Sequence, residues 1–138
     1  MALEKDFVKI LYVENNIGIG GSIFSLLYLM QGLKEIYRVK ACLIKNAAFY
    51  SLYKESNMEI IPINMECSLR TDHKARIVII IKKFIHVIRL AKKFYTIFKT
   101  EKPRIVHVNN GLKLNRSEII AAKLLRIPCV CHLRSMIH

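Results

Sequence analysis

The strongest constraint on the fold is a set of five short apolar runs that alternate with longer amphipathic segments. Each run is mainly apolar and lacks a strict apolar–polar alternation, which is typical of parallel strands that are buried on both faces. Strands that alternate with helices form βαβ units, and right-handed crossovers then produce a parallel sheet. We therefore expect an α/β fold whose sheet has the strand order 3-2-1-4-5, with helices on both faces. The expected strands are residues 8–13, 39–44, 59–63, 104–109 and 129–133.

Four helices are expected between these strands, over residues 22–37, 47–56, 75–100 and 117–126. Ser22 and Ser117 stand at the starts of the first and last helices, where a serine side chain can cap free backbone N–H groups. Pro128 follows the last helix and is expected to stop it. A length of 138 residues is typical of one domain, so we expect a single domain over residues 1–138.

Hydrophobic residues make up 53% of the chain, enough for a packed core. No window of about 18 residues is free of charge and apolar throughout, so no membrane span is expected. The first residues lack the apolar stretch of a signal peptide, which favours a cytoplasmic protein. The cysteines lack zinc-site spacing, and we expect no metal. Cys42, Cys129 and Cys131 lie in apolar runs and are expected to be core thiols, while Cys67 lies outside such runs.

The formal net charge of +13 implies an anionic partner, such as a phosphate, an acidic lipid headgroup or a nucleic acid. Composition alone does not choose among these partners.

Polar residues gather where the predicted strands end. In a parallel sheet the ligand site lies beyond the carboxyl ends of the strands, near the point where the strand order reverses. The same residues can also be ordinary polar loop residues without a function. The candidates at these ends are Asn15, Asn16, Asn109, Asn110, His132 and Arg134.

A glycine-rich loop with Gly18, Gly20 and Gly21 joins the first strand to the first helix. Glycines let a ligand approach the backbone, and a helix N-terminus attracts a phosphate, with Ser22 as the first side chain there. A tight turn that needs positive φ is the alternative. A dinucleotide fingerprint is disfavoured because Ile23 replaces its third glycine and Lys45 stands where an acid is required.

Three segments of the chain carry a family resemblance, and they read KILYVENNIGIGGSIFSLLYLMQGL, KPRIVHVNNG and SEIIAAKLLRIPCVCHLR. They resemble the N-terminal domain of family-4 glycosyltransferases, which have two Rossmann-like domains in the GT-B arrangement. The resemblance implies a Rossmann-like fold and a hexosyltransferase-like activity in polysaccharide biosynthesis. It implies that this half binds a glycan or lipid-linked acceptor, while the C-terminal half binds the nucleotide-sugar, which is a co-substrate; no cofactor is expected. Transfer retains the anomeric configuration, and Gly20 and Gly21 lie against the donor diphosphate.

The chain departs from the family pattern in two ways. Arg134 occupies a position where many members have a histidine, and His132 lies two residues earlier. The family's nucleotide-sugar domain is absent from the sequence, so we expect a truncated or split enzyme that needs this domain in cis or in trans. The chain alone is expected to be inactive.

The predicted helix over residues 75–100 is strongly basic and has an apolar stripe at helical spacing. The simplest expectation is that the stripe packs on the sheet. The stripe comprises Ile77, Ile81, Phe84, Ile88, Ala91, Tyr95 and Phe98.

Further apolar residues, including Leu90 and Phe94, lie outside this stripe beside the basic ones. That combination suits the anionic inner face of a membrane, although a basic face can also be merely solvated. A non-catalytic module that docks on a membrane or on a partner protein is therefore the alternative function; nucleic acid is disfavoured because no known binding module is present. The basic residues expected to face the membrane are Lys82, Lys83, Arg89, Lys92 and Lys93.

Overall fold

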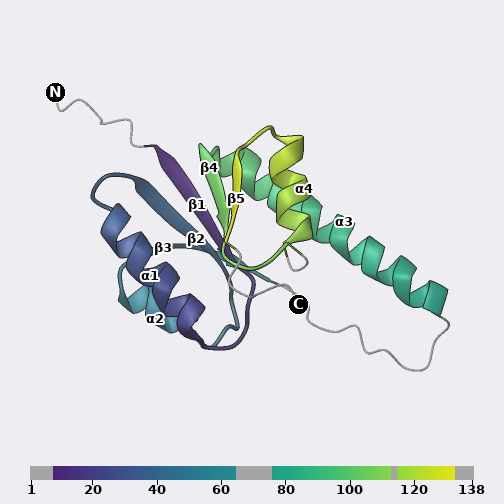
Figure 1. Ribbon diagram of the computed structural model, residues 1–138, viewed down its shortest axis with the longest axis horizontal. Coiled ribbons are helices and arrows are strands. Elements are labelled where there is room, and N and C mark those ends of the chain that lie inside the picture. The colour runs from purple at the N-terminus through teal and green to yellow at the C-terminus, as the bar shows by residue number, and fades with distance from the viewer. Residues whose placement is uncertain (1–7, 65–75, 113–114, 133–138) are drawn as a thin grey trace.

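The computed structural model describes residues 8–64, 76–112 and 115–132, which form a sheet with helices on both sides (Figure 1). The residues 1–7, 65–75, 113–114 and 133–138 lie outside the described part, and so do Cys67 and Arg134. In chain order the elements are β1 (Lys9–Glu14), α1 (Gly21–Leu33), β2 (Arg38–Ile44), α2 (Tyr50–Glu55), β3 (Glu59–Ile63), α3 (Arg76–Glu101), β4 (Ile105–Val108), α4 (Arg116–Leu124) and β5 (Cys129–Cys131).

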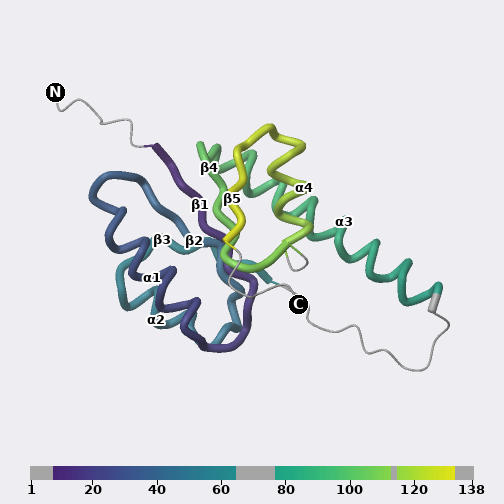
Figure 2. Tube along the Cα trace, in the orientation of Figure 1, coloured from purple at the N-terminus to yellow at the C-terminus, as the bar shows by residue number. Residues whose placement is uncertain are grey.

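The sheet has the order β3-β2-β1-β4-β5, and each neighbouring pair is parallel, which confirms the predicted topology. The chain first builds outward from β1 to β3 and then crosses to the other side of β1 to form β4 and β5 (Figure 2). This crossing makes β1 and β4 direct neighbours, with Ile10 opposite Ile105. The strand order therefore reverses at the β1–β4 junction.

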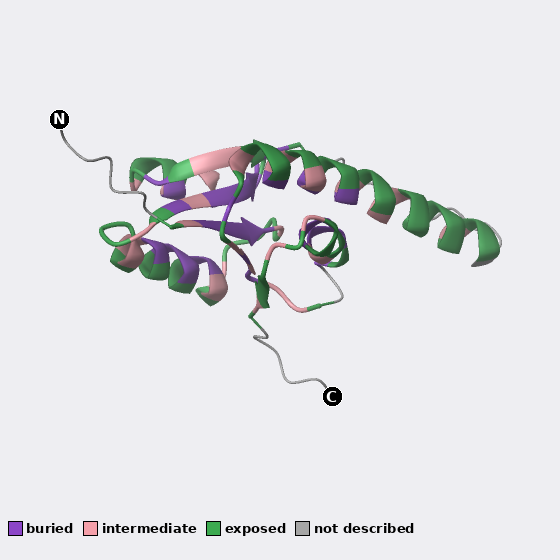
Figure 3. Ribbon diagram, turned by 90° about the horizontal axis from the view of Figure 1, so that it is seen from above, coloured by how far each residue is buried: buried purple, intermediate pink, exposed green. Residues whose placement is uncertain are grey.

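Two hydrophobic clusters lie on opposite faces of the sheet, because successive side chains of a strand point to opposite faces. Ile10 and Tyr12 pack with α1 and α2, whereas Leu11 and Val13 pack with α3 and α4. Figure 3, in which the molecule is seen from above, shows helices on both sides of the buried strands. The expectation of helices on both faces is confirmed.

Only the C-terminal half of α3 packs against the sheet. Phe94 and Phe98 are fully buried, whereas Ile77 and Phe84 are 71% and 65% exposed. A helix of 26 residues spans about 39 Å, far more than the 4 to 7 residues of the central strands can cover. The prediction that the whole stripe packs on the sheet is therefore wrong: its N-terminal residues Ile77, Ile81, Phe84 and Ile88 are exposed. The N-terminal half of α3 extends beyond the sheet (Figures 1 and 3).

Both predicted serine caps are wrong. The residue before α1 is Gly20, in an extended conformation, so Ser22 lies inside the first turn. The residue before α4 is Asn115, and Ser117 is buried within the helix. The Asn115 amide does not cap α4, because it donates to the carbonyl oxygens of Asn110 and Gly111. These contacts tie the start of α4 to the end of β4.

Several helices end earlier or later than predicted, at residues with left-handed backbone geometry. Asn57, Lys102 and Arg126 have φ angles of 54°, 48° and 55°, just beyond the ends of α2, α3 and α4. A residue in this conformation cannot continue a right-handed helix. The helix predicted over residues 117–126 accordingly ends at Leu124.

The described cysteines differ in burial. Cys42 is fully buried in the core as predicted, and burial raises the pKa of its thiol. Cys129 is exposed, which contradicts the prediction, because β5 is a three-residue edge strand with little covering it. Cys131 is half-buried, and its Sγ lies 3.2 Å from the carbonyl oxygen of Asn110. In the described part of the chain, no helix is long and apolar enough to cross a bilayer, and no three potential ligands gather around a metal site.

Candidate functional site

A buried carboxylate organises the carboxyl edge of the sheet at the β1–β4 junction. Glu14, the last residue of β1, has no exposed surface. Its Oε1 accepts hydrogen bonds from the backbone N–H of Asn16 at 2.9 Å and from Nδ2 of Asn110 at 2.6 Å. Its Oε2 accepts a hydrogen bond from Nδ2 of Asn109. The carboxylate thus joins the ends of the two strands at which the strand order reverses.

The hydrogen bonds continue from these strands to α4. Asn15 accepts a hydrogen bond from Asn110 at 2.8 Å, and its own Nδ2 donates to Asn115 at 3.1 Å and to Oε1 of Glu118 at 3.3 Å. Nδ2 of Asn115 donates to the carbonyl oxygen of Gly111 at 3.1 Å. We call the connected side chains the amide–carboxylate cluster; its members are Glu14, Asn15, Asn109, Asn110, Asn115 and Glu118.

Both protons of each amide group in this cluster are used. Nδ2 of Asn109, for example, donates to Glu14 and also to the carbonyl oxygen of Ser22 at 3.3 Å, which links β4 to the first turn of α1. A buried polar network whose donors are all satisfied is rigid and specifies one arrangement. The cluster therefore fixes the positions of β1, β4, α1 and α4 relative to one another.

Glu118 differs from the rest of the cluster in its protonation. The side chain is almost fully buried, and Oε2 has no hydrogen-bond partner among the described residues. Burial raises the pKa of this carboxyl to about 7, although hydrogen bonds from its own backbone N–H and from Asn15 oppose the shift. The group therefore gains or loses a proton near neutral pH.

The glycine-rich loop lies beside this cluster and leaves room around its backbone. A Cβ atom added at Gly18, Gly20 or Gly21 would meet no atom within 4 Å. No described glycine has a positive φ, so the alternative of a turn that requires positive φ is wrong. The open space is what a ligand needs in order to approach a backbone closely.

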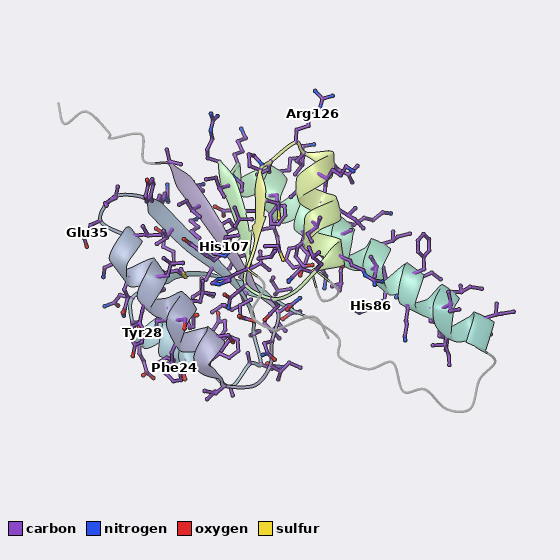
Figure 4. The ribbon with its side chains drawn as sticks, in the orientation of Figure 1. Phe24, Tyr28, Glu35, His86, His107 and Arg126 are labelled. Atoms are coloured by element: carbon purple, nitrogen blue, oxygen red, sulfur yellow. The ribbon has the colours of Figure 1, made fainter. Side chains whose placement is uncertain are left out.

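The predicted site residues are only partly brought together. Asn15, Asn109 and Asn110 belong to the cluster, and Asn16 contacts it through its backbone N–H. His132 is exposed just after β5, and its ring lies 5.9 Å from that of His107, which Figure 4 labels in the middle of the sheet. His132 therefore lies at the same edge, but no described hydrogen bond joins its side chain to the cluster.

Sequence reasoning missed three members of the cluster, namely Glu14, Asn115 and Glu118. An acid at the end of an otherwise apolar strand was a usable signal for Glu14, because an acidic residue is rarely buried without partners. Asn115 and Glu118 gave no such signal, since nothing local distinguishes them from other polar residues at a helix start.

The basic residues expected to face a membrane are all exposed on α3. Lys93 also donates a hydrogen bond to the carbonyl oxygen of Asn64 at 2.7 Å, next to the end of β3. Lys83 lies on the side of α3 that faces α4, where it lines a cavity.

Solved structures with the same fold include nucleotide-sugar enzymes. The chain aligns with MurG from Acinetobacter baumannii at a TM-score of 0.68 and 18% identity, covering 94% of this chain and 36% of MurG. It aligns with Anabaena HepE, solved with UDP and glucose, at 0.60 and 16% identity, covering 93% of this chain and 30% of HepE. No family model matches the sequence, and neither does any curated protein.

A match to a protein of a different class shows that the shared fold does not determine the activity. The C-terminal domain of a Pyrococcus furiosus hydrogenase aligns at a TM-score of 0.62 and 15% identity, covering 91% of this chain and 90% of that domain. The TM-scores of these three matches demonstrate a shared Rossmann-like fold. Their low sequence identities leave the activity open. The chain spans about a third of the length of MurG and HepE.

Proposed function

We propose that the chain is the acceptor-binding half of a retaining glycosyltransferase, which transfers a sugar from a nucleotide-sugar to a glycan or a lipid-linked acceptor. One observation carries the proposal: an open glycine loop lies directly beside a polar cluster at the switch point of the sheet. MurG and HepE share the fold, and HepE was solved with UDP and glucose, which supports the proposal.

Each part of this edge has a role in the proposed reaction. The free N–H groups at Gly20, Gly21 and Ser22 would stabilise the charge that develops on the leaving diphosphate. The rigid cluster would hold Asn110 at the edge, where its side-chain oxygen can accept a hydrogen bond from a sugar hydroxyl. Asn16, His132 and Arg134 would contact the acceptor or the diphosphate. The nucleotide-sugar half would be a second domain, supplied in cis or in trans.

Amide NMR with inorganic pyrophosphate as a stand-in for the donor diphosphate tests this proposal. Saturable shifts are expected at Gly20, Gly21 and Ser22, and sulfate should produce weaker ones. Gly20→Val is expected to fold, because nothing lies within 4 Å of the added Cβ, and to lose these shifts by blocking the backbone. Gly32→Val, near the C-terminal end of α1 and away from the glycine-rich loop, is the control. Shifts confined to α3 would contradict the proposal.

Membrane docking is a second candidate function, favoured by the exposed half of α3. Seven large apolar residues are exposed there, and exposed lysines and an arginine lie among them. An apolar face beside dense positive charge is typical of helices that lie on anionic bilayers. The exposed apolar residues are Ile77, Val78, Ile80, Ile81, Phe84, Ile85 and Ile88.

A further inference from the structure

An open groove lies between α3 and α4, the two helices that cover one face of the sheet. The groove lies between α4 and the N-terminal half of α3 and has a volume of about 580 Å³. In Figure 1 the N-terminal end of α3 continues past α4. The lining residues are Ile80, Lys83, Phe84, Val87, Arg116, Ile119 and Ile120. Five of these side chains are apolar and two are cationic, and none is acidic.

The groove and the amide–carboxylate cluster share the start of α4. Arg116, which lines the groove, is the first residue of α4 and directly follows Asn115, a member of the cluster. Glu118 lies in the same turn, but its carboxyl accepts a hydrogen bond from Asn15 and is buried in the cluster. Arg116, one of the two cations of the groove, is therefore one residue away from the cluster in the chain.

The size and charge of the groove favour one kind of occupant. A volume of 580 Å³ is within the range of about 300–1,000 Å³ that is typical of small-molecule sites. A partner helix of several turns, with a diameter of about 10–12 Å, would need a larger groove. A second copy of the chain would bring another +13 charges to a basic surface. In the described part of the chain, Lys83 and Arg116 form no ion pair, so both cations are available to an anion.

We propose that this groove binds the apolar chain of a phosphate-bearing amphiphile, with Lys83 and Arg116 contacting the phosphate. The binding depends only on residues of α3 and α4 and requires no sugar transfer. Where the proposed function also holds, the amphiphile is the lipid that carries the acceptor sugar, and the groove presents this lipid to the cluster.

Calorimetric titration with monomeric dodecyl phosphate tests the proposal without any sugar donor. Saturable binding of one molecule per chain is expected. Dodecyl maltoside, which has the same alkyl chain and no charge, should bind about tenfold more weakly, because it lacks the charge-assisted contacts. Inorganic phosphate alone should show no saturable binding in the groove. Equal affinity for the two dodecyl compounds would overturn the role of the cations.

Two double variants with the same change in net charge separate the groove from the general positive field. Lys83→Gln with Arg116→Gln should weaken dodecyl phosphate binding about tenfold. Lys82→Gln with Arg89→Gln, which leaves the groove lining intact, should change it less than about twofold. Equal losses in the two variants would overturn the proposal.

A third variant tests the apolar part of the groove. Ile80 is 65% exposed, so Ile80→Trp is expected to fold while filling the groove and weakening binding. Unchanged binding by a folded Ile80→Trp protein, with folding checked by circular dichroism, would place the alkyl chain elsewhere. Sedimentation velocity should show a monomer. A dimer that persists at saturating dodecyl phosphate and buries Ile80 would show that a second copy occupies the groove, against the proposal.

Discussion

Nδ2 of Asn110 donates a hydrogen bond to Oε1 of Glu14 over 2.6 Å, which ties the loop after β4 to the last residue of β1. The two residues are 96 positions apart in the chain and meet where the strand order of the sheet reverses. The position of the candidate site therefore follows from the sheet topology, because β1 and β4 are the neighbouring strands between which the strand order reverses.

Glu14→Gln is expected to destabilise the protein by about 1–3 kcal/mol, because the new amide group would turn N–H donors toward the donors of Asn109 or Asn110. Urea unfolding measures the change. Glu35→Gln, at an exposed position after α1 (labelled in Figure 4), is the control and should change the free energy of unfolding by less than about 0.5 kcal/mol. Equal effects would contradict the structural role of Glu14.

The titration of Glu118 predicts how stability depends on pH. Its folded pKa of about 7 lies above the value of about 4.3 for an unfolded glutamate, so the folded state binds the proton more tightly. The resulting stabilisation is fully present below the unfolded pKa and is lost as the pH rises through the folded pKa. This group alone is expected to lower the free energy of unfolding by roughly 3 kcal/mol between about pH 4.5 and pH 7.5.

Glu118→Gln isolates this effect, because the amide does not titrate. Urea unfolding of the wild type and the variant at pH 5, 6 and 7 should show the wild type losing stability relative to the variant as the pH rises. If the two proteins keep a constant difference over this range, Glu118 does not have a raised pKa in the folded state.

Phe84 and Phe94 form a matched pair on α3, one 65% exposed and one fully buried. Phe94→Ala is expected to cost about 3–5 kcal/mol, because it leaves a cavity between the helix and the sheet. Phe84→Ala should cost less than about 0.5 kcal/mol. Thermal and urea unfolding check both values. A similar loss in the two variants would mean that the N-terminal half of α3 is covered.

Vesicle co-sedimentation tests the docking of α3 on a membrane. Lys82, Lys83, Arg89, Lys92 and Lys93 could together supply roughly 5 kcal/mol of attraction to an anionic bilayer, at about 1 kcal/mol each. Binding should weaken as salt is added, since the charges act within about a Debye length. Equal binding to neutral and anionic vesicles, or no loss when all five residues become Gln, would rule out the electrostatic mechanism.

The purified chain is expected to transfer no sugar by itself. Positioning both substrates contributes much of the rate of such a reaction, and the proposal assigns the donor to a second domain. Incubation with labelled nucleotide-sugars and candidate acceptors, followed by product separation, measures the transfer. A turnover by the 138-residue chain alone would show that both substrates bind within it.

The sequence by itself determined the strand order and the strand ends on which the site lies. Mainly apolar runs without a strict alternation, such as residues 39–44, are typically buried between two helical layers, and right-handed crossovers leave few ways to arrange them. The sequence therefore places Asn109 and Asn110 at the edge beside the glycine loop.

Only the tertiary structure decided which side chains complete the site and which half of α3 is covered. Asn115 and Glu118 join the cluster because α4 begins beside β4, a distance relation that local patterns do not encode. Phe84 and Phe98 belong to the same apolar stripe of α3, yet only Phe98 is buried over the sheet. Periodicity reports which residues share a helix face, but the length of the strands beneath decides how far that face is buried.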